Sequence, residues 1–229
     1  MRKANTVTRV AIPLFFTAEA CLGLALQLAE GRAVAYLSYT VVVLACLFCA
    51  LFAQKEAAYL FTQLALILTL FADYFLVLAR EMQQTPAMFF FSAVQICYAL
   101  RLYAAEQSPA RRRVQLYLRA GLSLAALGMT LLVLRQGADT LALLSMFYYA
   151  NLVLNLALAA LAGREMRLMA AGLLLFLLCD TVIGLSFLEN YLPIAENSLL
   201  YDIISPGFNL AWAFYVPSQA LLSVSAMPR

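Results

Sequence analysis

The stretch LTLFADYFLVLARE, residues Leu68 to Glu81, places the carboxyl group of Asp73 deep inside an apolar run. A later stretch, FLLCDTVIGLSF, does the same with Asp180. A charge in the middle of a membrane span costs about 2.5–3.5 kcal/mol on insertion scales, so it is normally paired, neutralised or functional. We therefore expect these two acids to meet inside a helix bundle and to act as catalytic residues.

The composition around these stretches is that of a polytopic membrane protein. The chain has 229 residues, of which 65% are hydrophobic and only 12% are charged, a balance outside the soluble range. No long polar linker divides the chain, so we expect residues 1–229 to form a single integral-membrane helical domain. The basic residues form short clusters beside apolar runs, which argues against nucleic acid as a partner.

Apolar runs long enough to cross a bilayer, at about 20 residues each, occur eight times. The predicted fold is therefore all-α, with eight transmembrane helices in one bundle and short charged connections. We place the spans near Val10–Leu28, Ala33–Ala53, Ala57–Ala79, Ala87–Ala105, Val114–Leu134, Leu141–Ala162, Leu168–Leu188 and Leu200–Val224.

Lysine and arginine are distributed unevenly between the two sides of these spans, and this bias sets the orientation. If the N-terminus is cytoplasmic, only Arg32, Arg80 and Arg135 fall on the opposite side. Both termini are therefore predicted to be cytoplasmic. Arg101 and Arg119 lie inside spans near the same face, and we expect both to snorkel to the interface. The basic residues of the cytoplasmic side are Arg2, Lys3, Arg9, Lys55, Arg111, Arg112, Arg113, Arg164, Arg167 and Arg229.

The chain contains no histidine and five cysteines, all within apolar runs. The absence of histidine argues against a His-ligated zinc hydrolase and leaves carboxyl groups and tyrosines for acid–base chemistry. The number of cysteines is odd and their spacing is not that of a metal site, so we expect buried hydrophobic side chains. No metal and no organic cofactor is expected.

Polar residues recur at helical spacing inside six of the spans, while the second and fifth spans are nearly bare. In the third span Thr62, Thr69, Asp73 and Arg80 share one stripe. This pattern predicts a polar cavity, although such residues also commonly join helix to helix by hydrogen bonds. The candidate substrate-binding residues are Glu19, Gln95, Tyr98, Asn151, Asn155, Tyr215 and Gln219, and the sixth span also offers Tyr148.

Two motifs in the first half of the chain resemble those of the YhhN family of eight-helix membrane proteins, which includes the lysoplasmalogenases. The family has a phenylalanine-rich run that closes on Gly-Asp in its third helix, and LTLFAD, which ends at Asp73, is similar to it. It also has a His-x-x-Tyr element in the fourth helix, matched here by VQICYAL. Tyr98 is retained there, and Gln95 stands in place of the histidine.

Two further motifs carry the resemblance into the second half of the chain. A Gly-x-x-x-Phe-x-x-Ser-Asp run in the seventh helix is similar to GLLLFLLCD, which ends at Asp180 with Cys179 in place of the serine. The closing Tyr-x-x-x-Gln is similar to YVPSQ, Tyr215 to Gln219. The loss of the histidine and the serine leaves open an altered substrate or a relative without the activity.

The resemblance implies hydrolysis of the vinyl ether bond of a lysoplasmalogen, a lysophospholipid, to a fatty aldehyde and a glycerophospho-alcohol. The chemistry suits two acids, because one carboxyl can protonate the β-carbon and the second can stabilise the oxocarbenium ion or activate water, as in glycoside hydrolysis. Tyr98, Asn151, Tyr215 and Gln219 would orient water or the ether oxygen. The protein would lie in a bacterial cytoplasmic membrane, or in the endoplasmic reticulum of a eukaryote, among membrane lipids.

Other functions fit the same pair of buried acids. A transporter or proton-coupled carrier would use them as proton sites, and a helix broken near the midplane, for which Pro217 is the candidate, would favour it. A lipid-binding protein without turnover is a further alternative. A retinal-binding receptor fits poorly, because the two lysines, Lys3 and Lys55, lie at an end and in a connection.

Overall fold

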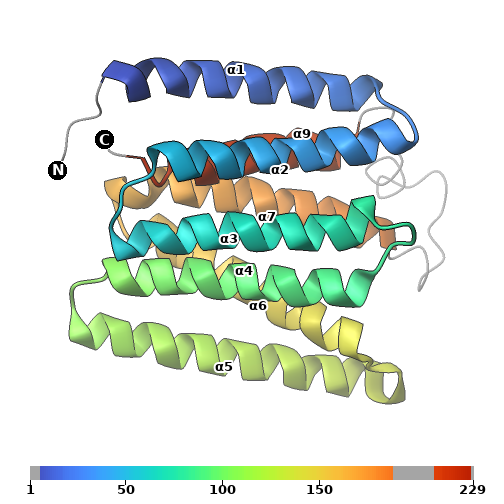
Figure 1. Cartoon of the computed structure of the whole chain (residues 1–229). Helices are drawn as coiled ribbons and strands as arrows, with labels where there is room; N and C mark the ends of the chain where they lie inside the picture. The colour runs from blue at the N-terminus through green and yellow to red at the C-terminus, as the bar shows by residue number, and fades with distance from the viewer. Residues whose placement is uncertain (1–5, 188–208, 228–229) are drawn as a thin grey trace.

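The computed structural model describes residues 6–187 and 209–227, and over these residues the chain is helical without any β-strand (Figure 1). Seven of the described helices are long and apolar enough to cross a membrane, and the chain is a multi-pass membrane protein. The α-helices are α1 (Thr6–Leu28), α2 (Arg32–Phe52), α3 (Ala57–Asp73), α4 (Gln84–Ala105), α5 (Pro109–Leu134), α6 (Thr140–Leu161), α7 (Arg167–Phe187) and α9 (Leu210–Val224).

The first seven predicted spans agree with α1 to α7, and the differences lie at the ends. Hydropathy detects the apolar part of a helix and misses its polar cap, which explains the difference at α5. This helix begins at Pro109 rather than near Val114, because the Ser108 hydroxyl caps it by accepting a hydrogen bond from the backbone N–H of Arg111 at 3.5 Å. The described part of the last predicted span is α9, whose 15 residues make it shorter than the others. Residues 200–208 of that span lie outside the described residues.

The helices form two layers (Figure 1). In one layer α2, α3 and α4 are neighbours in chain order, and α9, α7 and α6 form the layer behind them. Helix α1 packs on α2 and α9, whereas α5 lies at the opposite edge and packs on α6. This arrangement places α3, α6, α7 and α9, which carry both aspartates and their candidate partners, in the inner part of the bundle.

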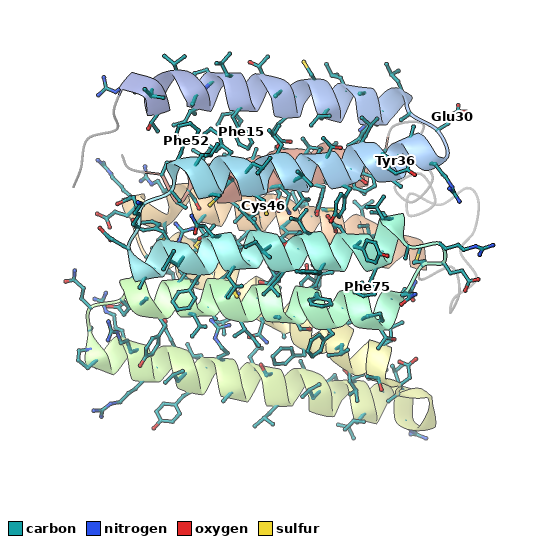
Figure 2. All side chains as sticks on the ribbon, viewed as in Figure 1. Phe15, Glu30, Tyr36, Cys46, Phe52 and Phe75 are labelled. Atoms are coloured by element: carbon teal, nitrogen blue, oxygen red, sulfur yellow. The ribbon has the colours of Figure 1, made fainter. Side chains whose placement is uncertain are left out.

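Aromatic rings fill the contact between α1 and α2. Figure 2 shows Phe15 of α1 beside Phe52 of α2. The ring of Phe15 stacks on Phe48 with 4.1 Å between centroids, and Phe48 lies 4.9 Å from Phe52. These rings belong to a buried cluster that also includes Ala220 and Val224 of α9. The cluster therefore ties α1 to both of its neighbours.

The end of α9 is fixed to the connection between α2 and α3. The backbone N–H of Gln54 donates to the carbonyl of Ala226 at 3.0 Å, and its side-chain amide donates to the carbonyl of Met227 at 3.1 Å. The start of α1 lies at the same end of the bundle (Figure 1). The described chain thus begins and ends on one side.

The prediction that Arg101 snorkels to the interface is wrong. Its side chain is 1% exposed and donates to the hydroxyls of Thr62 and Ser225, each at 2.7 Å, and to the backbone carbonyl of Ser225 at 2.7 Å. The guanidinium also lies over the ring of Tyr59, 5.2 Å from its centroid. These contacts hold the arginine inside the bundle, where it joins α3 and α4 to the end of α9.

Helices α7 and α9 approach closely at Gly172. A Cβ built on Gly172 would lie 2.8 Å from Cγ and 3.1 Å from the backbone nitrogen of Leu222. The hydroxyl of Ser218 donates to the carbonyl of Gly172 at 2.9 Å. The expected role of this glycine, a small residue that lets a neighbouring helix approach, agrees with the contact. At Gly184, by contrast, a Cβ would meet nothing within 4 Å.

We expect Gly172→Ala to lower the unfolding temperature in detergent, because overpacking of a tight contact costs about 1–3 kcal/mol. Gly121→Ala is the matched control, since a Cβ at that position in α5 meets nothing within 4 Å. Alanine there should leave the unfolding temperature unchanged or slightly higher. Equal stability of both variants in a thermal unfolding assay would contradict the close packing of α7 on α9.

Candidate functional site

Each of the two intramembrane aspartates accepts a hydrogen bond from a tyrosine on a neighbouring helix. Tyr215 of α9 donates its hydroxyl to the carboxyl of Asp73 at the end of α3. Tyr148 of α6 donates its hydroxyl to the carboxyl of Asp180 on α7. Asp73 is buried and Asp180 is partly buried. Within the described residues neither acid forms an ion pair, so a phenol is the principal partner of each.

The two tyrosine–aspartate pairs lie close to each other. The ring of Phe176 lies between the two tyrosines, with its centroid 6.0 Å from that of Tyr215 and 6.5 Å from that of Tyr148. Both contacts are edge-to-face, a favourable geometry for aromatic rings. The two predicted acids are thus bound to tyrosines on either side of one ring.

The backbone changes its helical form at Asp73. Helix α3 ends at this residue and continues as the π-helical turn η1 (Tyr74–Leu78), in which the N–H of Ala79 donates to the carbonyl of Tyr74 at 2.8 Å. The ring of Phe75 in this turn stacks on Phe90 of α4 at 5.8 Å. Single π-helical turns are frequent at functional sites, because the wider turn re-aims nearby side chains.

The candidate amides Asn151, Asn155 and Gln95 form a network of their own with Arg119. Asn155 donates to the side-chain carbonyl of Gln95 at 3.0 Å and to its backbone carbonyl at 2.9 Å. Arg119 of α5 donates to the amide oxygens of Asn151, at 2.8 Å, and Asn155, at 2.9 Å. Arg119 is therefore directed toward α6 and does not snorkel as predicted. Its contact also corrects the expectation that the fifth span carries no polar face.

Glu19 of α1 and Gln219 of α9 lie level with each other in a second region of the bundle. The two helices are antiparallel, because the side chain of Gln27 donates to the carbonyl of Asn209 at 3.1 Å while Gly23 packs against Val216. Glu19 is 1% exposed and Gln219 0%. Neither side chain has a hydrogen-bond partner among the described residues. Both belong to the polar interior, yet neither contacts an aspartate.

Tyr98 of α4 is fully buried, and its hydroxyl has no hydrogen-bond partner among the described residues. The same is true of the hydroxyl of Ser92 and of the side-chain nitrogen of Gln95 on that helix. Buried polar groups are normally satisfied by protein or ordered water. The face of α4 that carries these groups is therefore suited to bind water or a polar part of a ligand.

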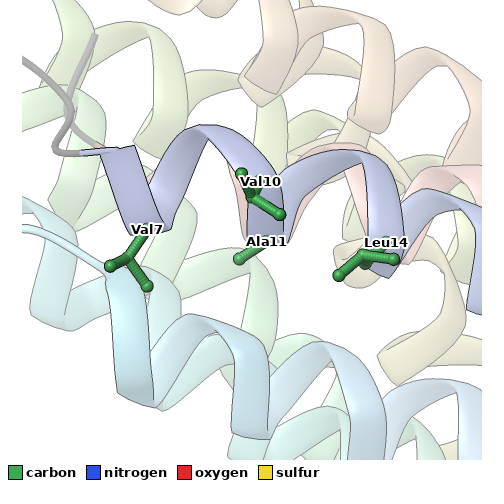
Figure 3. A pocket seen from close by; sticks show the side chains of 4 residues that line it. All are labelled: Val7, Val10, Ala11 and Leu14. Carbon is green, nitrogen blue, oxygen red and sulfur yellow. The ribbon is translucent and has the colours of Figure 1, made fainter.

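A pocket on α1 lies apart from this polar interior. It is lined by Val7, Val10, Ala11 and Leu14, side chains that share one face of the helix (Figure 3). All four are apolar, so this pocket offers contacts for a hydrocarbon chain and no group for acid–base chemistry. Among the described residues, no cluster of three or more His, Cys, Asp or Glu side chains is placed to hold a metal ion.

The sequence model of the YhhN family matches residues 34–226. The chain belongs to the YhhN family. The matched residues include both tyrosine–aspartate pairs, Phe176 and Arg119, whereas Glu19 lies before them. No curated protein and no solved structure matches the chain. Membership of the YhhN family therefore rests on the family model together with the motifs identified in the sequence.

Two neighbours of the acids, Tyr148 and Phe176, are not among the candidate site residues predicted from the sequence. Tyr148 shares a helix face with Asn151 and Asn155, at a spacing of three and seven residues, so that stripe was the available signal. Phe176 is one turn from Asp180 on α7 and is the phenylalanine of the GLLLFLLCD run, so the resemblance to the family motif was the available signal. Its role becomes visible only when α6, α7 and α9 are packed together.

We expect Tyr148→Phe to destabilise the protein by about 1–3 kcal/mol, because the buried carboxyl of Asp180 loses its hydroxyl donor. Tyr149→Phe is the matched control: its hydroxyl makes a 3.0 Å hydrogen bond to Thr181 in a more exposed position between the same two helices. That loss should cost about 0.6 kcal/mol. Thermal unfolding of the two variants in detergent compares them, and a larger effect at Tyr149 would contradict the assignment of the pair.

Proposed function

We propose that this YhhN-family protein is a hydrolase of the lysoplasmalogenase type. It cleaves the vinyl ether bond of a lysophospholipid to a fatty aldehyde and a glycerophospho-alcohol. The observation that carries the proposal is the meeting of two tyrosine–aspartate pairs, Asp73 with Tyr215 and Asp180 with Tyr148, around Phe176 inside the bundle.

The proposed reaction begins with proton transfer from one carboxyl to the β-carbon of the vinyl ether. The C=C bond supplies the electron pair for the new C–H bond, and the ether oxygen stabilises the resulting oxocarbenium ion. Two acids close together rarely carry charge at the same time, which leaves one as the proton donor and the other as the anion. The second carboxylate lies near the cation and stabilises it electrostatically.

Water then completes the reaction. The second carboxyl accepts a proton from water as its oxygen bonds to the cationic carbon, which gives a hemiacetal. The hemiacetal hydroxyl then gives its proton to the first carboxylate as the C=O bond of the aldehyde forms and the other C–O bond breaks, and the second carboxyl returns its proton to the departing alcohol oxygen. The buried hydroxyls of Tyr98 and Ser92, which lack partners among the described residues, are candidates to hold that water. Gln95, whose side-chain nitrogen also lacks a partner among the described residues, can orient the polar part of the substrate.

We expect Asp73→Asn and Asp180→Asn each to abolish release of aldehyde from lysoplasmalogen in detergent, because the amide can neither donate a proton to carbon nor carry the negative charge. The losses should be at least about a hundredfold, as for removal of a general acid or base. Asp139→Asn is the control. Asp139 caps α6 by accepting from the N–H of Ala142 at 2.8 Å, and asparagine caps a helix equally well.

Full activity in either acid variant would refute the catalytic role of that carboxyl. Ion-coupled flux of a solute in liposomes, without product, would instead favour a carrier that uses the same acids as proton sites. Helix α9 runs from Leu210 to Val224 through Pro217 without interruption, so the broken helix that would favour a carrier is absent from this segment. Stabilisation by lysophospholipid without turnover would favour a lipid-binding protein.

We also propose that the end of the bundle where α1 begins and α9 ends faces the cytoplasm. The connections at that end carry Lys55, Arg111, Arg112, Arg113 and Arg164, whereas Arg32, Arg80 and Arg135 lie at the opposite end. Positively charged connections are retained on the cytoplasmic side during insertion.

Reporter fusions test this orientation. Alkaline phosphatase fused to the C-terminus should be inactive, because this enzyme becomes active only after export. Green fluorescent protein fused at the same position should be fluorescent, because it folds in the cytoplasm. The same reporters placed in the connection between α5 and α6, after a truncation at Asp139, should give the opposite result. Active phosphatase at the C-terminal fusion would reverse the proposed orientation.

A further inference from the structure

Arg119 lies within the apolar part of α5, beyond the basic cluster at the start of that helix. It lies six positions after Arg113, which corresponds to about 9 Å along the helix axis. Helix α5 packs on α6 at the edge of the bundle, and the side chain of Arg119 is partly buried in that contact. An arginine at this depth is costly unless it has a partner or a function.

The guanidinium of Arg119 is held in one orientation by α6. It donates to Asn151 at 2.8 Å and to Asn155 at 2.9 Å. Both amides are fixed in turn, because Asn151 donates to the Ser123 hydroxyl at 3.1 Å and Asn155 donates to Gln95 at 3.0 Å. The hydrogen bonds from Arg119 to Asn151 and Asn155 use two of the five N–H groups of the guanidinium.

The positive charge of Arg119 is not neutralised by these amides. Within the described residues, Arg119 forms no ion pair with a carboxylate. A guanidinium in surroundings of low dielectric constant attracts an anion strongly, and its planar fork matches the oxygens of a phosphate. The side chain is partly exposed, so part of it is accessible to such a group.

We propose that Arg119 binds the phosphate of the lysophospholipid whose vinyl ether is cleaved between Asp73 and Asp180. The lipid then enters from the leaflet at the basic end of the bundle, where α5 begins. This inference rests on the proposed function and adds to it the residue that recognises the head group. The ligand class is a lysophospholipid rather than any lipid with a vinyl ether.

The spacing along α6 supports this assignment. Tyr148, which binds Asp180, shares a face with Asn151 and Asn155, which bind Arg119. At 1.5 Å per residue, the axial separations from Tyr148 are about 4.5 Å and 10.5 Å. In a lysoplasmalogen, seven bonds separate the phosphorus from the β-carbon, an extended length of about 9 Å from standard bond lengths. The axial distance along α6 between the partners of Arg119 and the partner of Asp180 therefore matches the length of one head group.

Binding of ligands that cannot be hydrolysed tests this role without catalysis. A 1-alkyl lysophospholipid and the corresponding 1-alkylglycerol differ only in the phosphate head group. Maltoside micelles contain no phosphate to compete with either ligand. The single tryptophan, Trp212, lies 5.7 Å from the ring of Tyr215, so its fluorescence can report occupancy near the acids.

We expect Arg119→Gln to weaken binding of the alkyl lysophospholipid roughly tenfold to a hundredfold, as for loss of a charged hydrogen bond. Binding of the alkylglycerol should not change. Arg119→Lys should retain part of the phosphate preference, because it keeps the charge but loses the fork. Arg113→Gln is the matched control, since Arg113 is an exposed residue of the same helix, and it should bind both ligands as the wild type does.

Three results would overturn the role of Arg119. If Arg119→Gln weakens the binding of both ligands equally, the arginine only connects α5 to α6. An unchanged phosphate preference would remove Arg119 from the head-group site. Displacement of the alkyl lysophospholipid by an equal concentration of inorganic phosphate would show that the site does not select a lipid. If Arg119 contributes to binding of the alkyl lysophospholipid but the wild type releases no aldehyde from lysoplasmalogen, the proposed hydrolysis is refuted and the role of Arg119 in phosphate binding remains.

Discussion

The hydrogen bond from a tyrosine hydroxyl to an intramembrane carboxyl is the interaction on which this site depends. A phenol satisfies one carboxyl oxygen without cancelling its charge, whereas an arginine or lysine would neutralise it. Tyr215 holds Asp73 and Tyr148 holds Asp180 in this way. Each bond also joins two helices, so the same contacts that position the acids connect α9 to α3 and α6 to α7.

Two other polar layers surround this site at different depths. Toward the end where α9 finishes, Arg101 joins α3 and α4 to Ser225. Between α5 and α6, Arg119 contacts Asn151 and Asn155. Both arginines use neutral hydroxyl, amide or carbonyl oxygens, and the two carboxyl groups remain without basic partners among the described residues. The groups of opposite charge are therefore held apart among the described residues.

Much of the architecture could be predicted from the sequence, because length and hydropathy determine which segments span a bilayer. The stretch around Asp73 and the stretch around Asp180 identified the two acids for the same reason. The role of Arg119 could not be predicted in this way, since snorkelling and an inward contact with Asn151 are equally compatible with its position. Which polar residues contact one another depends on the order of helices in the bundle, and hydropathy carries no information about that order.

The π-helical turn after Asp73 has a consequence for the charge balance of the third span. In an uninterrupted α-helix, Arg80 would share a stripe with Asp73 two turns earlier and its long side chain would reach back toward the acid. One additional residue in the π-helical turn rotates the residues that follow it by about 100°. The helix then ends at Leu78, and Arg80, which lies beyond this end, is exposed. A local widening of the backbone thus accompanies the absence of an ion pair between Arg80 and Asp73 among the described residues.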